Sequence, residues 1–318
     1  MASSSTTPDP RNRDAARERA RQLADQHARQ DKRSRRLLQF GILALVLVIL
    51  AVIGVVVAQN RSQQIPEAGP VPASANQWGG TVLTADGIRT GESEVDQRDL
   101  GEVPEAPETP DDTAVPPGVE PAAEGEPVPV VIFQDFECVH CADFETENGE
   151  ALEEAVTNGD ITLEYRNLNF LDRATPTQYS SRAAAAAYEV GNQVSTEQYL
   201  AFVQEVFSHQ GTGGLDDEQL VEIASTHGAD IAAALEENTW RPLVNVVSQE
   251  SLANGISGTP TVFIDGERLG NEAFQDALDE AVADCVWVVG TSSRKVEGKR
   301  RLSPRAVAEE LVQRAGQG

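Results

Sequence analysis

Cysteine is scarce in this sequence, with only three such residues in 318. A small domain held together by disulfides would carry more cysteines in a shorter chain, so this class of protein is excluded. Cys138 and Cys141 are three positions apart, whereas Cys285 lies far from both. The spacing favours a redox-active pair plus one further thiol. That third thiol is either a small buried apolar side chain or a group that pairs with another molecule.

Positive charge is also scarce, because 25 Lys and Arg face 51 Asp and Glu, for a net charge of -26. Residues 1–40 carry a net charge of +5, which leaves -31 for the rest of the chain. Binding to nucleic acid through its phosphates needs clustered cations that displace counterions. We therefore expect no nucleic-acid partner and an acidic domain that resists self-association.

One apolar run interrupts this polar chain, since residues 37–60 contain no charge and 40–58 are apolar throughout. A helix of this length can cross the roughly 30 Å hydrocarbon core of a bilayer. Basic residues between 29 and 36 precede it, which indicates a cytoplasmic N-terminus. We predict a cytoplasmic basic tail over 1–36 and a transmembrane helix over 37–58, with the rest of the chain outside.

A cleaved signal peptide is the alternative interpretation of this run. Its polar leader of 36 residues and its long apolar stretch both exceed what is typical of a signal peptide, whose apolar core has about 7–15 residues. Either interpretation places the cysteine pair in a compartment where disulfides persist.

Residues 59–126 are predicted to form a linker. Within it, residues 81–89 indicate a short hairpin that turns at Asp86–Gly87. Residues 91–127 contain twelve acidic residues, seven prolines and one basic residue. Such a composition buries too little apolar surface to offset the entropy of ordering, so we expect a disordered or loose segment. An acidic arm that docks on a basic partner is the alternative.

A domain with alternating strand and helix signals begins at residue 127. The expected elements, in chain order, are a strand over 128–133, a helix ending near 156, a strand over 161–165, a helical block over 175–255, a strand pair over 261–269 and a helix over 271–282. This order predicts an α/β sheet domain with an inserted helical subdomain. Residues 285–318 follow as an extension with a basic stretch and a short final helix.

The Cys138–Val139–His140–Cys141 motif lies between the first strand and the first helix of this domain. A helix N-terminus offers free N–H groups and partial positive charge, and both stabilise a thiolate, the nucleophilic form of cysteine. We expect Cys138 to be the nucleophile and Cys141 to resolve the mixed disulfide. The imidazole of His140 is expected to stabilise the thiolate and make the disulfide more oxidising, unless it faces solvent with no role.

Zinc binding is the rival interpretation of two cysteines at this spacing. A structural zinc site needs four ligands, and only Cys285, His209 and His227 could complete one. None of these repeats the paired spacing, so we expect no metal. We also expect no cofactor, because the thiols themselves form the redox couple.

Two stretches, FQDFECVHC at 133–141 and GTPTVFIDG at 258–266, resemble the two signatures of the DsbA-like thioredoxin-fold family. The resemblance implies a thioredoxin-like fold over 127–284 with its helical insertion at 175–255. It also implies that Pro260 is cis and faces the cysteines, with Thr259 beside the substrate disulfide. Val139 and Phe136 are further candidates for substrate contact.

The sequence departs from the family pattern at two points. Val139 stands where the oxidising members usually have proline, and no acidic residue occurs within 130–133, which leaves Asp135 as the nearest carboxylate. The expected function is disulfide formation in exported proteins, with a membrane redox partner that re-oxidises the pair. An isomerase or reductase of the same fold stays open, as does a non-catalytic, membrane-tethered interaction module.

Overall fold

The computed structural model describes Ile49 and residues 65–111, 113–123, 125–210, 213–270 and 274–285. The chain divides into two units, Met1–Gln64 and Ile65–Gly318, and the fold below is that of the second unit.

A mixed sheet with strand order β3-β2-β6-β5-β7-β8 forms the centre of this unit. β5 and β6 run parallel, with Val130 opposite Leu163, and the other neighbours in the sheet are antiparallel. A separate pair, β1 and β4, is also antiparallel. The strands are β1 Ala68–Pro70, β2 Thr81–Thr84, β3 Gly87–Ile88, β4 Gln97–Asp99, β5 Val128–Gln134, β6 Ile161–Asn167, β7 Thr261–Ile264 and β8 Glu267–Arg268.

The central strands are buried on both faces, as the nearly continuous apolar run in β5 predicts. Side chains alternate along β6, so Tyr165 faces one side of the sheet and Arg166 the other. On the second side, Arg166 Nε lies 2.6 Å from Glu164 Oε1, and this ion pair is almost fully buried.

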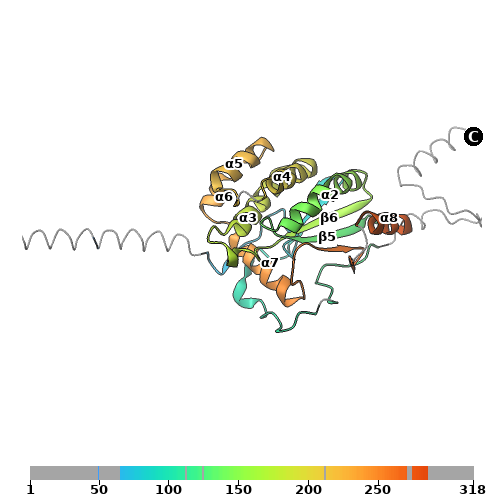
Figure 1. Ribbon diagram of the computed structural model, residues 1–318, viewed down its shortest axis with the longest axis horizontal. Helices are drawn as coiled ribbons and strands as arrows, with labels where there is room; N and C mark the ends of the chain where they lie inside the picture. Colours follow the sequence, from blue (N-terminus) through green and yellow to red (C-terminus); the bar gives the residue numbers. More distant parts are fainter. Residues whose placement is uncertain are drawn as a thin grey trace, which may run out of the picture. The chain divides into compact units, whose positions relative to one another are not determined.

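Helices cover both faces of the sheet (Figure 1). α2 and α8 pack on the face towards which Tyr165 points, and the rings of Phe144 and Phe274 meet edge to face between them. α7 lies on the opposite face with β1 and β4, where Arg98 pairs with Glu250. The helices are α2 Val139–Thr157, α3 Tyr179–Gly191, α4 Thr196–Ser208, α5 Asp217–Thr226, α6 Ala232–Glu236, α7 Arg241–Ala253 and α8 Phe274–Cys285, with 3-10 turns at Leu100–Glu102 and Asp172–Ala174.

The predicted helical insertion is confirmed, since α3 to α7 occupy residues 179–253 between β6 and β7. Ser195 and Asp216 each form a capping box that fixes where α4 and α5 begin. The thioredoxin-like α/β fold is therefore present, with the insertion in the expected place.

The linker differs from its prediction, because part of it belongs to the sheet. The hairpin turns where expected, but β2 also pairs with β6, and Leu83 is fully buried. A two-stranded hairpin alone is marginally stable, and pairing with β6 supplies the missing partner. The folded domain thus begins before residue 127.

The acidic segment also differs from its prediction, because it lies against the domain. Its backbone carbonyls accept hydrogen bonds from buried or helical side chains, as in the 3.0 Å bond from Arg166 Nη1 to Pro117 O. Val119 is buried, and the N–H of Ala122 donates to Asp265 Oδ1 at 2.6 Å. Composition predicted disorder for this segment because the few residues that contact the domain are outnumbered by charged ones.

The predicted tail over 1–36, the transmembrane helix over 37–58 and the extension after Cys285 lie outside the described residues, apart from Ile49. In the part of the chain that the structure describes, no helix is both long and apolar enough to span a bilayer.

Packing of the acidic segment can be tested at Gly255, whose φ is +85° and whose added Cβ would lie 2.4 Å from the carbonyl oxygen of Asp111. Gly125 is the matched control, since its φ is +86° and nothing lies within 4 Å. Alanine at either position should cost about 1 kcal/mol through its positive φ. Gly255→Ala should lose about 1–3 kcal/mol more, measured by urea unfolding, because the segment must shift. Equal losses in the two variants would show that the segment does not pack there.

Candidate active site

Cys138 is the N-cap residue of α2, at the end of the short loop that follows β5. Its N–H donates to Asp135 O at 2.9 Å, and the N–H groups of Cys141 and Ala142 donate to Cys138 O. Both cysteines are free thiols, so the structure represents the dithiol form. Cys138 is 7% exposed and Cys141 1% exposed, which leaves Cys138 as the thiol that a substrate can reach.

The surroundings of Cys138 lower its pKa from 9.0 to about 5. The largest cause is the hydrogen bond from the Cys141 side chain; Thr259 and the backbone N–H groups of Cys141 and His140 also lower the pKa. Burial raises the pKa of Cys138. The backbone carbonyl of Thr259, 3.2 Å from Sγ, also favours the thiol, because a thiolate has no proton to donate to it. The donors outweigh both, because several hydrogen bonds converge on one sulfur, so Cys138 is a thiolate at neutral pH.

Cys141 has the opposite environment. Burial raises its pKa far above the ordinary value, and the hydrogen bond and negative charge of Cys138 raise it further. The two thiols therefore differ sharply in acidity, with an accessible nucleophile and a buried partner, which is the arrangement that thiol–disulfide exchange requires.

The loop before β7 completes the site. The peptide bond between Thr259 and Pro260 is cis, as the resemblance implies. Thr261 pairs with Phe133, so this loop lies at the same end of the strands as the β5–α2 loop that leads to Cys138. Thr259 and Pro260 are both partly exposed, so a substrate chain can lie against them beside Cys138.

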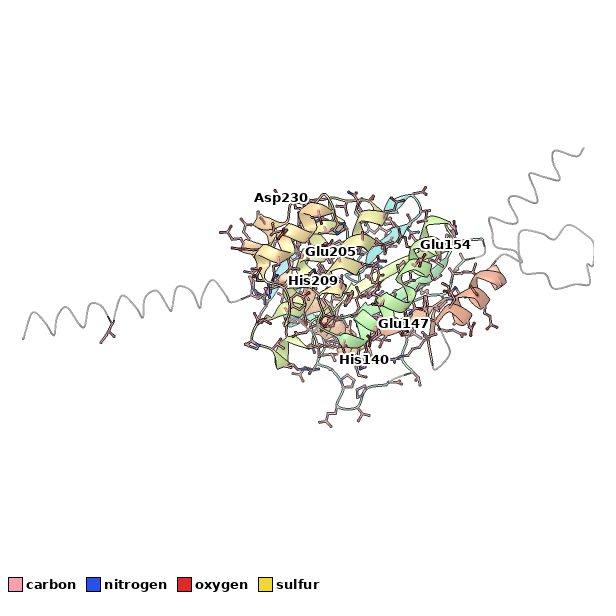
Figure 2. All side chains as sticks on the ribbon, turned by 45° about the horizontal axis from the view of Figure 1, so that its top comes forward. His140, Glu147, Glu154, Glu205, His209 and Asp230 are labelled. Atoms are coloured by element: carbon pink, nitrogen blue, oxygen red, sulfur yellow. The ribbon has the colours of Figure 1, made fainter. Side chains whose placement is uncertain are left out.

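Val139 and His140 are exposed at the start of α2, where Figure 2 shows His140. Val139 is 56% exposed, an unusual exposure for a large apolar side chain. The backbone N–H of His140 contributes to the low pKa of Cys138. A contribution from its imidazole stays a prediction.

Phe136 is not a substrate contact, contrary to the expectation from sequence. Its side chain is fully buried, and its ring packs on Phe207 of α4 with 5.0 Å between centroids. Phe136 instead fixes the loop before Cys138 against the helical insertion.

Asp135 has a larger part in the site than its sequence position suggested. It is fully buried, and its carboxylate accepts hydrogen bonds from the N–H groups of Glu137 at 2.9 Å and Leu171 at 3.0 Å. Burial raises its pKa to about 6, although hydrogen bonds to Ser180 and to those N–H groups oppose the rise. Asp135 thereby ties the cysteine loop to the segment before α3.

Glu145 is a buried acid that the sequence analysis missed. It lies on α2 four residues after Cys141, and it is 4% exposed. Burial raises its pKa to about 7, against the effect of a 2.9 Å hydrogen bond from Tyr165 Oη. The sequence analysis considered an acid only in the strand before the motif. The pattern that could have identified Glu145 is an acid on the buried face of the helix, four residues after a cysteine.

The histidines considered as zinc ligands have other surroundings. His227 Nε2 lies 2.6 Å from Glu205 Oε2, and His209 ends α4. Within the described ranges, no group of three or more His, Cys, Asp or Glu side chains is arranged to hold a metal ion.

The sequence matches a protein-family model described as thioredoxin over residues 122–284, just over half of the chain. Among curated proteins, it is similar to the serine/threonine-protein kinase PknE of Mycobacterium tuberculosis, with 28% identity over 163 residues. PknE of Mycobacterium bovis matches equally. The match covers 47% of this chain and 28% of the kinase, so the chain spans under a third of the length of these relatives.

Solved structures with similar folds include three bacterial proteins. The disulfide bond oxidoreductase DsbG from Mycobacterium tuberculosis has 26% identity and a TM-score of 0.46, covering 56% of this chain and 88% of that one. The thiol-disulfide oxidoreductase MdbA from Corynebacterium diphtheriae has 23% identity and a TM-score of 0.45, covering 55% and 95%. BdbD from Bacillus subtilis has 20% identity and a TM-score of 0.45, covering 56% and 100%.

Replacement of Asp135 by Asn tests the buried carboxyl. Its raised pKa means that the native state holds this proton more tightly than the unfolded state, with an ordinary pKa of 3.8. The stability from this proton is complete below that pH and is lost as pH rises through about 6. Relative to wild type, Asp135→Asn should therefore gain about 2–3 kcal/mol of unfolding free energy across this window. Urea unfolding at several pH values measures the difference, and a difference independent of pH would contradict the assignment.

Proposed function

The chain belongs to the DsbA-like thioredoxin-fold family of thiol–disulfide oxidoreductases, and from this premise we propose that it forms disulfides in exported proteins, outside the cytoplasm. The observation that carries the proposal is the low pKa of Cys138 beside the high pKa of Cys141. A stabilised thiolate favours the reduced enzyme, and this makes its disulfide a strong oxidant.

The reaction begins with the oxidised enzyme, in which Cys138 and Cys141 form a disulfide. A substrate thiolate attacks Cys138 Sγ, Cys141 leaves as a thiolate, and a mixed disulfide forms between the substrate and Cys138. A second substrate thiolate then attacks the substrate sulfur of this mixed disulfide. Cys138 leaves readily because its thiolate is stabilised, and the substrate departs with a new disulfide while the enzyme keeps a dithiol.

Substrate binding is proposed for the exposed rim around Cys138. Thr259 and Pro260 offer an edge beside the sulfur, and proline has no N–H that would compete for the bound chain. The exposed side chain of Val139 offers an apolar contact next to it. His140 is exposed two residues after Cys138, and its imidazole is proposed to interact with the thiolate.

The extracytoplasmic location is supported by the apolar run at 37–58 and the basic residues before it, which favour a single-pass anchor with a cytoplasmic N-terminus. Disulfides made by the enzyme would persist there. Each turnover leaves the enzyme reduced, so the proposal includes a membrane redox partner that restores its disulfide.

A reductase or isomerase is the second candidate, and Val139 is the observation that favours it. This exposed apolar residue stands between the cysteines where oxidising relatives usually have proline. The chemistry of the pair is the same, and the reduction potential decides the direction.

The reduction potential of the Cys138–Cys141 pair is therefore the test, measured by equilibration with glutathione buffers. The oxidase proposal predicts a value between about -180 and -120 mV, because the low pKa of Cys138 stabilises the reduced form. A value near about -270 mV, that of thioredoxin, would reject the oxidase and favour the reductase. A Cys285→Ser variant should give the same potential, which shows that the third thiol does not contribute.

A further inference from the structure

A cavity of about 210 Å³ borders the residue that directly precedes Cys138. Its walls come from the loop after β5, from the first residue of α3, and from the end of α4 with the loop that follows. The lining residues are Glu137, Tyr179, His209, Gln210, Gly213 and Gly214. None of them belongs to the loop that holds the cis peptide bond of Pro260. The cavity is therefore separate from the edge that we propose for the substrate backbone.

Hydrogen bonding and close packing hold the walls of this cavity in place. Gln210 Nε2 donates to Phe136 O at 2.6 Å, which ties the end of α4 to the loop before Cys138. Gly214 lies against the buried Tyr179, since an added Cβ would be 2.7 Å from Cγ of the ring. Gly213 faces open space, with nothing within 4 Å of an added Cβ. A fixed wall thus meets an opening that no side chain at Gly213 narrows.

The carboxylate in this cavity is that of Glu137, which is half-buried. It accepts hydrogen bonds from Thr175 Oγ1 at 3.0 Å and from Ser180 Oγ at 3.4 Å, and both reach the same oxygen, Oε2. No ion pair in the described part of the chain includes Glu137. Oε1 therefore keeps its capacity to accept a hydrogen bond from a group that enters the cavity.

The cation beside Tyr179 is already paired. The guanidinium carbon of Arg182 lies 5.8 Å from the centroid of the Tyr179 ring. Its nitrogens bond to Asp217 Oδ1 at 2.7 Å and to the backbone carbonyls of Thr177 and Leu215. The chain outside residues 1–40 also carries a net charge of -31. A positively charged side chain that enters the cavity would therefore meet an unpaired carboxylate in an acidic domain.

We propose that this cavity binds the Lys or Arg side chain of a substrate residue next to the cysteine that reacts with Cys138, with Glu137 as its ion-pair partner. The inference rests on the proposed function and adds a class of substrate to it. In a mixed disulfide the Cα atoms of the two cysteines are about 5.5–6 Å apart. Neighbouring residues in a chain are about 3.8 Å apart, so a long side chain beside the substrate cysteine can reach Glu137.

Neither the fold nor the exchange reaction requires a negative charge at Glu137. A glutamine could accept the same two hydrogen bonds from Thr175 and Ser180. A carboxylate beside Cys138 disfavours the thiolate, because like charges repel, so the exchange reaction by itself favours a neutral residue there. A bound Lys or Arg would offset that repulsion and would orient the substrate cysteine. Recognition of a cationic substrate therefore accounts for a charge that the other roles leave unexplained.

Replacement of Glu137 by Gln tests the proposal, because the amide keeps the hydrogen-bond acceptor and removes the charge. Glu147→Gln and Glu154→Gln are matched controls, since both side chains are exposed on α2 (Figure 2). The probes are two reduced two-cysteine peptides of identical composition, with a lysine either next to the first cysteine or several residues away. Single-turnover oxidation by the oxidised full-length protein is followed at about pH 8, above the ordinary titration range of histidine, with rates expressed per peptide thiolate.

The quantity to compare is the rate for the peptide with the adjacent lysine divided by the rate for its isomer. The two peptides have the same net charge, so the general field of the domain cancels in this ratio. The ratio in Glu137→Gln gives the intrinsic effect of a lysine on the neighbouring thiol. Wild type and both controls should exceed that ratio about fivefold, which is the contribution of one accessible ion pair. An equal ratio in wild type and Glu137→Gln would overturn the proposal.

A charge reversal provides a second variant. Glu137→Lys should favour a peptide with glutamate next to the cysteine over its isomer, by about fivefold relative to Glu137→Gln. A purely structural role would instead slow both isomers equally, and this result would overturn the proposal. Failure of the oxidase function would look different, because every protein would oxidise both peptides slowly. The ratio is then measured in the opposite direction, as reduction of the two peptide disulfides by the reduced protein, with the same expected and contradicting results.

Discussion

The hydrogen bond from the Cys141 thiol to the Cys138 sulfur depends on a helix that begins at Val139 and keeps one face buried. The bond forms because the first turn of α2 places the two sulfurs on the same side, with backbone N–H groups directed at Cys138. Phe136 and Asp135 hold the preceding loop by packing on α4 and by bonding to the segment before α3. The helical insertion therefore acts on the chemistry indirectly, through the loop that it fixes.

Two buried carboxyls, one just before this helix and one on it, respond to burial differently from the reactive sulfur. Asp135 and Glu145 both have raised pKa values because burial outweighs their hydrogen bonds. Ionisation of either group destabilises the fold, in contrast to an acid that is paired with a cation. Cys138 has the opposite shift, and its thiolate is the form that the fold favours. The fold thus stabilises the charged form of the reactive sulfur and disfavours the charged forms of the two carboxyls.

Strong local patterns in the sequence predicted most of the fold and the centre of the site. The apolar β5, the helical block and the pair Cys138 and Cys141 could be assigned because burial and spacing follow from adjacent residues. The joining of β2 to β6 depends on contact between distant segments, and composition gave no sign of it. Phe136 and Glu145 were misjudged or missed for the same reason, since burial of single side chains is decided by α4 and β6.

The central claim is that Cys138 is held as a thiolate by the start of α2 and by Cys141. The most direct test is titration of the reduced protein by the ultraviolet absorbance of its thiolate, with Cys138→Ser as the blank. The structure predicts a midpoint at about 5 that is missing from the blank. A midpoint near about 8.5, the pKa of an ordinary cysteine, would contradict the claim.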